Sequence, residues 1–322
     1  MMTVQSIYDL GLKMAIASDP RGKTVVRDEL RRYKESYEKM SGEEKKYFDK
    51  EYFKNPYSDS RILNNPKPNQ PIKRMFAGID ADEDELLLAD RLGNIDLVMS
   101  HHPHGIALAD LPEVMNVQVE IMHQAGVPVH VAENLLHTRM AEVNRGVLPI
   151  NDHKTVDVAR LLNMAYMSTH TFTDNMVASF FGDLIKKHQK KLYYVSDVLD
   201  LLMTIPEYQV AKQQKSGPCL YTGSPKRRCG RIVCTEMTGG TNGAKEMFAQ
   251  LSHAGVGTVI GMHMKEDHRK VAEEHHLNVV IAGHISSDSI GMNLLLDAIE
   301  KKGVAVIPVG GLIRVKRYGQ RR

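Results

Sequence analysis

The sequence has few cysteines and no long apolar segment, and each absence excludes a class of protein. Its three cysteines fit no Cys-x-x-Cys spacing, so neither a disulfide framework nor a structural zinc knuckle is indicated. No apolar run is long enough to cross a bilayer, and the amino terminus lacks the charged and apolar regions of a signal peptide. We therefore expect a cytoplasmic protein that does not associate with membranes.

Neither positive nor negative charge is in large excess. The chain carries 42 lysines and arginines against 39 aspartates and glutamates, a formal net charge of +3. Such a small excess argues against a general nucleic-acid binder. At 322 residues and 42% hydrophobic content, the chain is long and apolar enough for two packed domains.

Strand and helix patterns alternate after residue 73, which predicts βαβ units and mainly parallel or mixed sheets in an α/β protein. Residues 1–72 predict a helical extension that ends in a proline-rich linker. Residues 73–150 together with 226–322 predict an α/β domain, and 151–225 a mostly helical middle domain or insertion. The expected strands are 75–79, 95–99, 127–132, 231–235, 257–260, 277–282 and 304–309.

Histidines follow two of these strands at the point where each strand ends. Ser100-His101-His102-Pro103-His104 follows strand 95–99, and His284 follows strand 277–282 with Asp288 four residues later. Residues at i and i+4 share one helix face, so His284 and Asp288 can bind one cation. Parallel strands bring their carboxyl ends to one edge of a sheet, so we predict a metal site there, in a cleft.

Two more strand ends carry similar side chains. Strand 127–132 leads into Glu133 and His137, and strand 257–260 leads into His263. Residues 168–175 also offer His170 or Asp174 to the cleft, although Asp174 is at least as well explained as a helix N-cap. The alternative for the whole set is an α/β domain with scattered histidines.

At these residues the chain resembles the Nif-three-like proteins, a dinuclear-metal family whose members are often named type-2 GTP cyclohydrolase I. The family pattern is an apolar strand ending in His-His-Pro, a later His-Thr-Asn-Leu-Asp segment, and a C-terminal Gly-His followed four residues on by Glu. Here His101-His102-Pro103 is intact, and Asp288 replaces the Glu after His284. We align the middle element with residues 133–137, which puts Glu133 and His137 at the family's His and Asp positions.

The resemblance spans roughly residues 73–150 and 229–322. It implies a two-metal site in a two-domain α/β protein that forms a homo-oligomer, with a hexameric ring as the expected form. The implied cofactor is one or two divalent transition metal ions, which the mixed ligand set leaves open among zinc, iron, manganese, cobalt and nickel. The implied ligands are His101, His102, His137, His284 and Asp288.

Our leading hypothesis is a metal-dependent hydrolase that acts on a small polar or nucleotide-like molecule, with phosphorylated substrates included. A bound cation would supply an acidic water near neutral pH. Glu133 is then a ligand or a general base, and His104 and His263 are candidates for proton transfer. The alternative is a non-catalytic metal-binding or regulatory scaffold.

Overall fold

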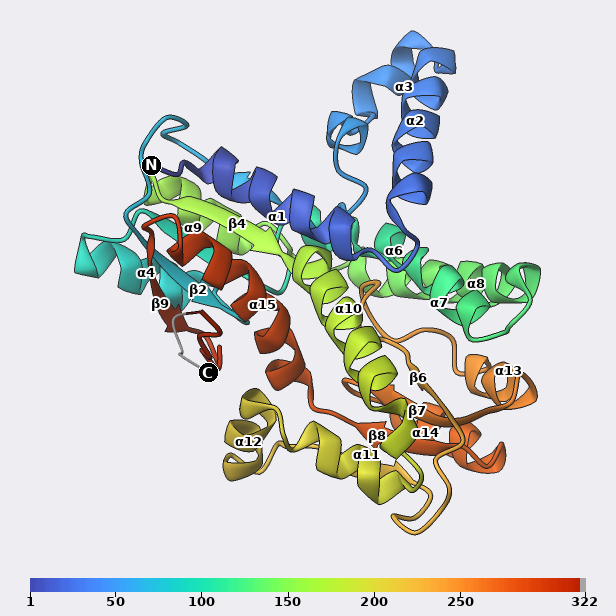
Figure 1. Ribbon diagram of the computed structural model, residues 1–322. Coiled ribbons are helices and arrows are strands. Elements are labelled where there is room, and N and C mark those ends of the chain that lie inside the picture. The colour runs from blue at the N-terminus through green and yellow to red at the C-terminus, as the bar shows by residue number, and fades with distance from the viewer. Residues whose placement is uncertain (319–322) are drawn as a thin grey trace.

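The computed structural model describes residues 1–318, in which two mixed β-sheets are covered by helices (Figure 1). The first sheet has the order β1-β4-β3-β2-β9, with β1 Ser60–Asn64, β2 Arg74–Gly78, β3 Leu97–Ser100, β4 Ala165–Thr169 and β9 Ala305–Val309. The second has the order β5-β8-β7-β6, with β5 Cys219–Thr222, β6 Arg231–Cys234, β7 Val256–Gly261 and β8 Asn278–Ile281.

Helices connect these strands. Their bounds are α1 Val4–Ser18, α2 Lys23–Lys39, α3 Gly42–Tyr47, α4 Glu83–Leu92, α5 Ile106–Ala109, α6 Leu111–Val114, α7 Val117–Gln124, α8 Val129–Val147, α9 Lys154–Leu161, α10 His170–His188, α11 Val195–Leu202, α12 Pro206–Gln213, α13 Met247–His253, α14 Glu266–Glu274 and α15 His284–Glu300, with 3₁₀ helices η1 Lys50–Phe53 and η2 Gln189–Lys191. Within residues 1–318, no helix is both long and apolar enough to cross a membrane.

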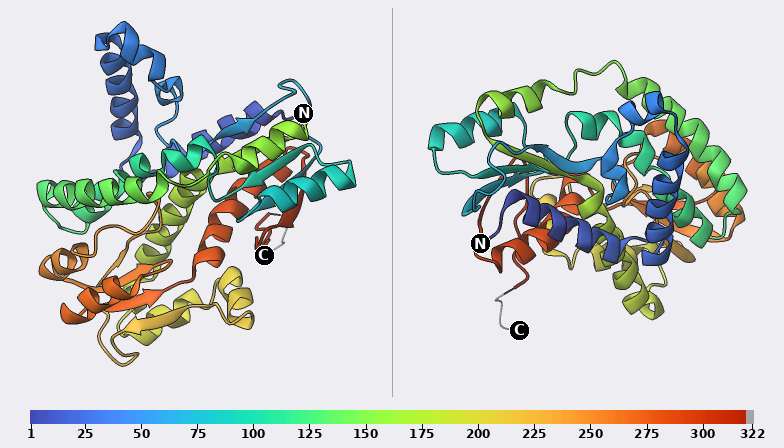
Figure 2. Two further views of the ribbon diagram at one scale, coloured as in Figure 1. Left: turned by 180° about the vertical axis from the view of Figure 1, so that it is seen from behind. Right: turned by 90° about the horizontal axis from the view of Figure 1, so that it is seen from above.

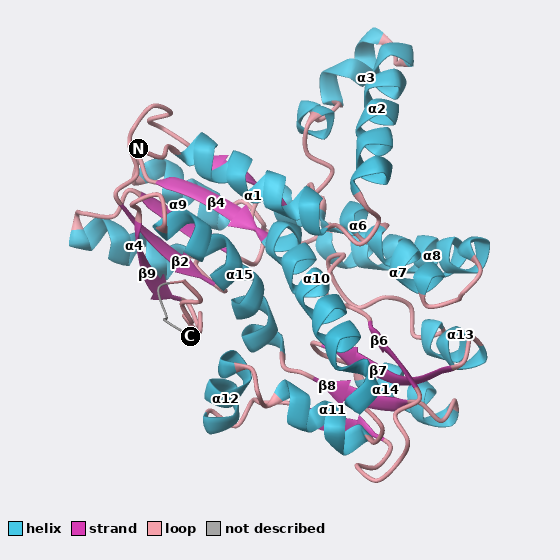
Figure 3. Cartoon of the chain, viewed as in Figure 1, coloured by secondary structure: helices cyan, strands magenta, loops and turns pink. Residues whose placement is uncertain are grey.

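Each sheet has one antiparallel edge strand, β1 or β5, and is otherwise parallel. Figure 3 shows the two sheets as separate groups of strands with helices around them. This arrangement confirms the predicted α/β class with mixed sheets. Because parallel strands need crossover helices, each sheet is covered on both faces.

Four clusters of buried apolar side chains fill these layers. In the first sheet, one face packs against α1, α10 and α15, and the other against α4 and α9. In the second sheet, one face packs against α7, α8, α13 and α14, and the other against α10, α11, α12 and α15. Helices α10 and α15 therefore contribute to the cores of both sheets.

The division of the chain between the sheets differs from the predicted one. Strands from 226–322 belong to both sheets, and β4, from the predicted middle segment, lies between β1 and β3. The predicted linker contains β1, which pairs with β4, and α1 packs on α10. Helices α2 and α3, with η1 beside α2, form an arm that stands away from the body (Figure 2).

The predicted strand 127–132 is wrong, because helix α8 starts at Val129. Its buried residues Ala132, Leu136, Arg139 and Val143 recur with the period of a helix, and the apolar ones pack against the second sheet. The apolar run that resembled a strand is the first turn of this helix, preceded by Val127 in the same core.

Helices α10 and α15 cross at unusually close range. A Cβ on Gly291 of α15 would lie 2.3 Å from the Thr173 carbonyl oxygen of α10, so only glycine permits this approach. Figure 1 shows the two helices side by side between the sheets. Their separation fixes how the first turn of α15 meets the first turns of α10.

We expect Gly291→Ala to lower the free energy of unfolding by about 2 kcal/mol, because the added methyl group must push two packed helices apart. Gly182→Ala, in α10, is the matched control, since a Cβ there meets nothing within 4 Å. It should stabilise the protein by about 0.5–1 kcal/mol through helix propensity. Urea denaturation measures both; equal effects of the two substitutions would contradict the close-approach argument.

Candidate metal centre

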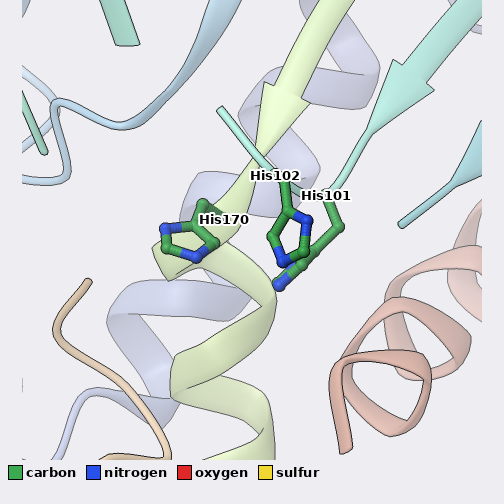
Figure 4. Close-up of side chains that lie close together, drawn as sticks. All are labelled: His101, His102 and His170. Carbon is green, nitrogen blue, oxygen red and sulfur yellow. The ribbon is translucent and has the colours of Figure 1, made fainter. Parts of the chain in front are cut away.

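Three adjacent parallel strands of the first sheet deliver polar side chains to one edge. Asp80 follows β2, His101 and His102 follow β3, and His170 follows β4 as the first residue of α10. The ring centroid of His101 lies 5.1 Å from that of His102 and 4.9 Å from that of His170. Figure 4 shows the three rings gathered between the end of β3 and the start of α10.

The remaining side chains come from the first turns of two helices. Asp174 lies one turn into α10, and His284 and Asp288 lie on the first turn of α15, directly after β8 of the second sheet. The ring centroids of His284 and His102 are 5.2 Å apart. The cluster therefore joins the carboxyl ends of strands from both sheets.

His101 is held so that its Nε2 faces the cluster with a lone pair. Its Nδ1 lies 2.9 Å from the Thr173 hydroxyl oxygen. That hydroxyl donates to the Thr169 carbonyl oxygen at 2.9 Å, so it accepts a hydrogen bond from His101 Nδ1. The proton thus sits on Nδ1, which leaves Nε2 as a ligand atom.

Carboxylates hold the other two histidines of this sheet edge. His102 Nδ1 lies 2.5 Å from Asp80 Oδ1, and His170 Nδ1 lies 2.8 Å from Asp59 Oδ2. Asp59 Oδ2 also accepts a hydrogen bond from the Thr171 hydroxyl at 2.7 Å. Carboxylates in this position orient metal-binding histidines and raise their basicity.

The Nε2 atoms and the carboxylate oxygens approach one another without hydrogen bonding. His101 Nε2 lies 3.5 Å from Asp174 Oδ1 and 3.6 Å from Asp288 Oδ1. Asp288 Oδ2 lies 3.7 Å from His102 Nε2 and 3.5 Å from His284 Nε2. Two ligands about 2.1 Å from one ion at tetrahedral angles lie about 3.4 Å apart, so these separations suit ligands that share an ion.

Four buried polar atoms in this cluster have no hydrogen-bond partner in the described residues: His101 Nε2, Asp174 Oδ1, Asp288 Oδ1 and Asp288 Oδ2. Each such atom costs about 1–3 kcal/mol when left unsatisfied. Three groups of these side chains, His101/His102/His170, His102/His284/Asp288 and His101/Asp174/Asp288, have ligand atoms within 4.8 Å of one another. The donor set therefore fits a divalent cation.

Burial also shifts the pKa values in the cluster. It raises the pKa of Asp174 to about 7, and, with the nearby Asp174 carboxylate, raises that of Asp288 well above its usual range. Burial and neighbouring imidazoles lower the pKa of His284 to about 3. Burial opposes a charge on His170, but the Asp174 and Asp59 carboxylates outweigh it and raise the pKa of His170 to about 9.

Some predicted site residues lie beside this cluster. His263 follows β7, and its ring centroid is 4.7 Å from that of His284. His104 is outside the three groups; its Nδ1 lies 2.7 Å from the Tyr166 hydroxyl, which donates to the Ala81 carbonyl oxygen. His104 is thereby tied to the first sheet.

Glu133 and His137 do not join the cluster. Both are exposed on α8, which lies against the second sheet, and neither belongs to the groups of potential ligands among residues 1–318. The reason is the wrong strand prediction: residues 127–137 do not bring a strand end to the site. The ligand role of His137 and the ligand or base role of Glu133 have no support in this geometry.

His170 and Asp174 take the places assigned to Glu133 and His137. His170-Thr171-Phe172-Thr173-Asp174 keeps the His-Thr and Asp of the pattern His-Thr-Asn-Leu-Asp with the same spacing. The N-cap of α10 is Thr169, so Asp174 is not an N-cap. The signal that identifies both residues is the spacing of this segment, which begins three residues after the apolar run 164–167.

Comparison with solved structures indicates the same family as the histidine motifs. A NIF3 superfamily protein from Sphaerobacter thermophilus aligns with 97% of this chain and 99% of its own, at 27% identity and a TM-score of 0.78. The chain belongs to the NIF3 superfamily. HcgD from Methanocaldococcus jannaschii in its reduced form is 12% identical with a TM-score of 0.48, over 77% of this chain and 87% of its own.

A third similar structure, that of TTHA1606 from Thermus thermophilus, is 15% identical with a TM-score of 0.43, over 90% of this chain and 99% of its own. No protein-family model and no curated protein matches the sequence. Membership of the NIF3 superfamily thus rests on the full-length likeness to the Sphaerobacter protein, together with the cluster at the carboxyl ends of the strands.

The family's His-Thr-Asn-Leu-Asp segment can be aligned with residues 133–137 or with residues 170–174, and each alignment predicts a different histidine whose loss removes the metal. His170→Ala should lower the metal content of the purified protein, because His170 Nε2 faces Asp174 Oδ2 at 3.8 Å within the cluster. His137→Ala, which alters an exposed histidine on α8, is the matched control and should keep its metal. Elemental mass spectrometry compares the two; loss of metal in His137→Ala alone would restore the first alignment.

Proposed function

We propose that this NIF3 superfamily member is a metal-dependent hydrolase that acts on a small polar or nucleotide-like molecule. The observation that supports it most is the set of four buried, unpartnered ligand atoms on His101, Asp174 and Asp288 among the described residues. Buried polar groups are almost always satisfied, and exceptions mark functional sites or a missing ion. Divalent cations bound at this cluster would satisfy these atoms.

The ligand atoms divide into two sets, which supports two ions. His101 and Asp174, with His170 beside them, face Asp288 Oδ1, whereas His102 and His284 face Asp288 Oδ2. Asp288 would then be shared by both ions. Imidazole and carboxylate ligands together suit zinc, iron, manganese, cobalt or nickel.

The cluster is closed on one side and open on the other. The side chains of His101 and Asp288 are 1% exposed, whereas that of His284 is 40% exposed. Structural metal sites are closed by protein ligands, and catalytic sites keep a position for water or substrate. The exposed face at His284 therefore favours catalysis over the alternative of a non-catalytic scaffold.

Metal ions in such a site supply an acidic water and polarise the substrate. His263 is the candidate proton-transfer group beside it, because its ring centroid lies 4.7 Å from that of His284. Burial and nearby histidines lower its pKa to about 4, which keeps the imidazole neutral at neutral pH and makes it a weak base. A neutral imidazole next to His284 can accept a proton and return it to a leaving group. The histidines are oriented by hydrogen bonds: His102 by Asp80, His170 by Asp59 and His101 by Thr173.

The first experiment is elemental analysis of the untagged protein beside His101→Ala and His284→Ala. We expect one to two equivalents of a transition metal, lost in both variants, because the two motifs hold the same ions. Bound metal at 100 times its dissociation constant stabilises the fold by about 2.7 kcal/mol, so chelation should lower the melting temperature of the wild type. A metal content that stays the same in both variants would exclude this cluster as the metal site.

Hydrolysis is then measured with a nucleotide panel on the loaded protein, with His263→Gln as the test of the base. We expect His263→Gln to retain its metal and to lose turnover. A loaded protein that turns over no member of the panel, and in which the metal has no open coordination position by X-ray absorption spectroscopy, would instead support the scaffold.

We also propose that the protein is a homo-oligomer. Helices α4 and α9 pack together and expose large apolar side chains: Leu87 is 53% exposed, Leu92 51% and Leu161 74%. Apolar patches on a helix pair often mark contacts between subunits. Light scattering should give a mass above that of one chain, and Leu161→Glu should reduce it. A monomeric wild type would contradict the proposal.

A further inference from the structure

A cavity of about 610 Å³ opens directly beside the metal centre. His263 and His284 form part of its lining, and the segment from the end of α12 to β5 forms another part. Ligand-binding cavities in proteins usually measure about 300–1,000 Å³, so this one suits a small organic molecule. Such a molecule would lie against the exposed face of His284.

The walls of this cavity combine apolar surface with positive charge. Met262, Ile281 and Pro218 are buried side chains of the lining, and Tyr221 adds an aromatic ring that is 43% exposed. Lys212 and Lys215 also line the cavity, and neither forms a salt bridge within residues 1–318. In the part of the chain that the structure describes, no aspartate or glutamate lines it.

Resting on the proposed function, we infer that this cavity is the substrate pocket and that it takes a phosphate monoester with a flat aromatic body. The apolar walls and Tyr221 would pack against the ring, since aromatic groups stack well on such surfaces. Lys212 and Lys215 would bind the phosphate, whose charge near neutral pH is about −1.5 to −2. Two lysines without acidic partners among the described residues match that charge.

The backbone around Lys215 forms the C-terminal cap of α12, in which the Ser216 amide donates to the Ala211 carbonyl oxygen and the Lys215 amide to that of Lys212. Lys215 adopts a positive φ of 63°, a conformation that side chains other than glycine rarely adopt. A Cβ on Gly217 would lie 2.8 Å from the Lys212 Cα, so the turn folds tightly back onto the end of α12. The turn thereby brings both lysines to one cavity.

The test compares binding of adenosine 5′-monophosphate and phenyl phosphate with binding of adenosine, by calorimetry on the metal-loaded protein. We expect Lys212→Gln/Lys215→Gln to weaken both phosphate monoesters at least tenfold and to leave adenosine unchanged. Lys190→Gln/Lys191→Gln is the matched control: these exposed lysines, on η2, carry the same charge and lie outside the cavity. It should bind as the wild type does.

A single variant separates binding from folding. Lys215→Gly removes the amine and the unfavourable φ together, so its melting temperature should equal or exceed that of the wild type while it weakens the phosphate monoesters. Equal binding to wild type and to the double lysine variant, or no binding of either monoester to the wild type at millimolar concentration, would overturn the inference.

Cys219 provides an independent reporter, because its exposed thiol lines the same cavity. Cys229 is buried, and burial raises the pKa of Cys234 to about 12, so neither competes for a thiol reagent. We expect adenosine 5′-monophosphate to slow alkylation of Cys219 in the wild type and not in the double lysine variant. Unprotected Cys219 in a protein saturated with the ligand would place the binding elsewhere.

The two proposals fail separately in these experiments. A protein without metal whose phosphate binding still depends on the lysines would refute the metal-dependent hydrolase and keep the pocket. A protein with metal and hydrolysis, but with no effect of the lysine substitutions, would refute the pocket and keep the hydrolase.

Discussion

The structure around the cluster depends on two buried carboxyl groups that lie close together. Asp174 and Asp288 lie on neighbouring helices and both face His101 Nε2, at 3.5 and 3.6 Å. Removing a carboxylate from water is expensive unless a partner compensates it, and His170 is the one imidazole of the described cluster whose pKa is raised. A divalent cation would supply the opposite charge that these two carboxyl groups lack among the described residues.

Thr173 contributes both to the packing of α10 against α15 and to the orientation of a candidate ligand, His101. Thr173 accepts the hydrogen bond that fixes the proton on His101 Nδ1, and its carbonyl oxygen is the atom that Gly291 of α15 must clear. A shift of α15 away from α10 would move Asp288 away from His101. The close helix crossing is therefore part of the metal centre, although neither glycine nor threonine is itself a ligand.

The sequence predicted those parts of the site whose signal is local. His101 and His102 follow an apolar run and precede a proline, and His284 and Asp288 share a helix turn. The same reasoning failed at residues 127–137, since an apolar run that opens a helix resembles a strand until its later residues show a period of 3.6. It underweighted His170 because β4 passes directly into α10 without the glycine or proline that usually marks such a boundary. The order of the strands in the sheet decides which strand ends lie next to each other. This order is a long-range property that cannot be predicted from any short segment.

The replacement of the family's glutamate by Asp288 does not loosen the cluster, because both oxygens of the shorter side chain reach across it. Oδ1 faces His101 and Oδ2 faces His102 and His284. Helix α15 begins at His284, so His284 and Asp288 lie one turn apart on the same face of the helix. His284 also lines the neighbouring cavity, so the same residue belongs to the candidate metal centre and to the cavity wall. The candidate metal centre and the neighbouring cavity therefore meet at the N-terminus of α15, at the junction of the two sheets.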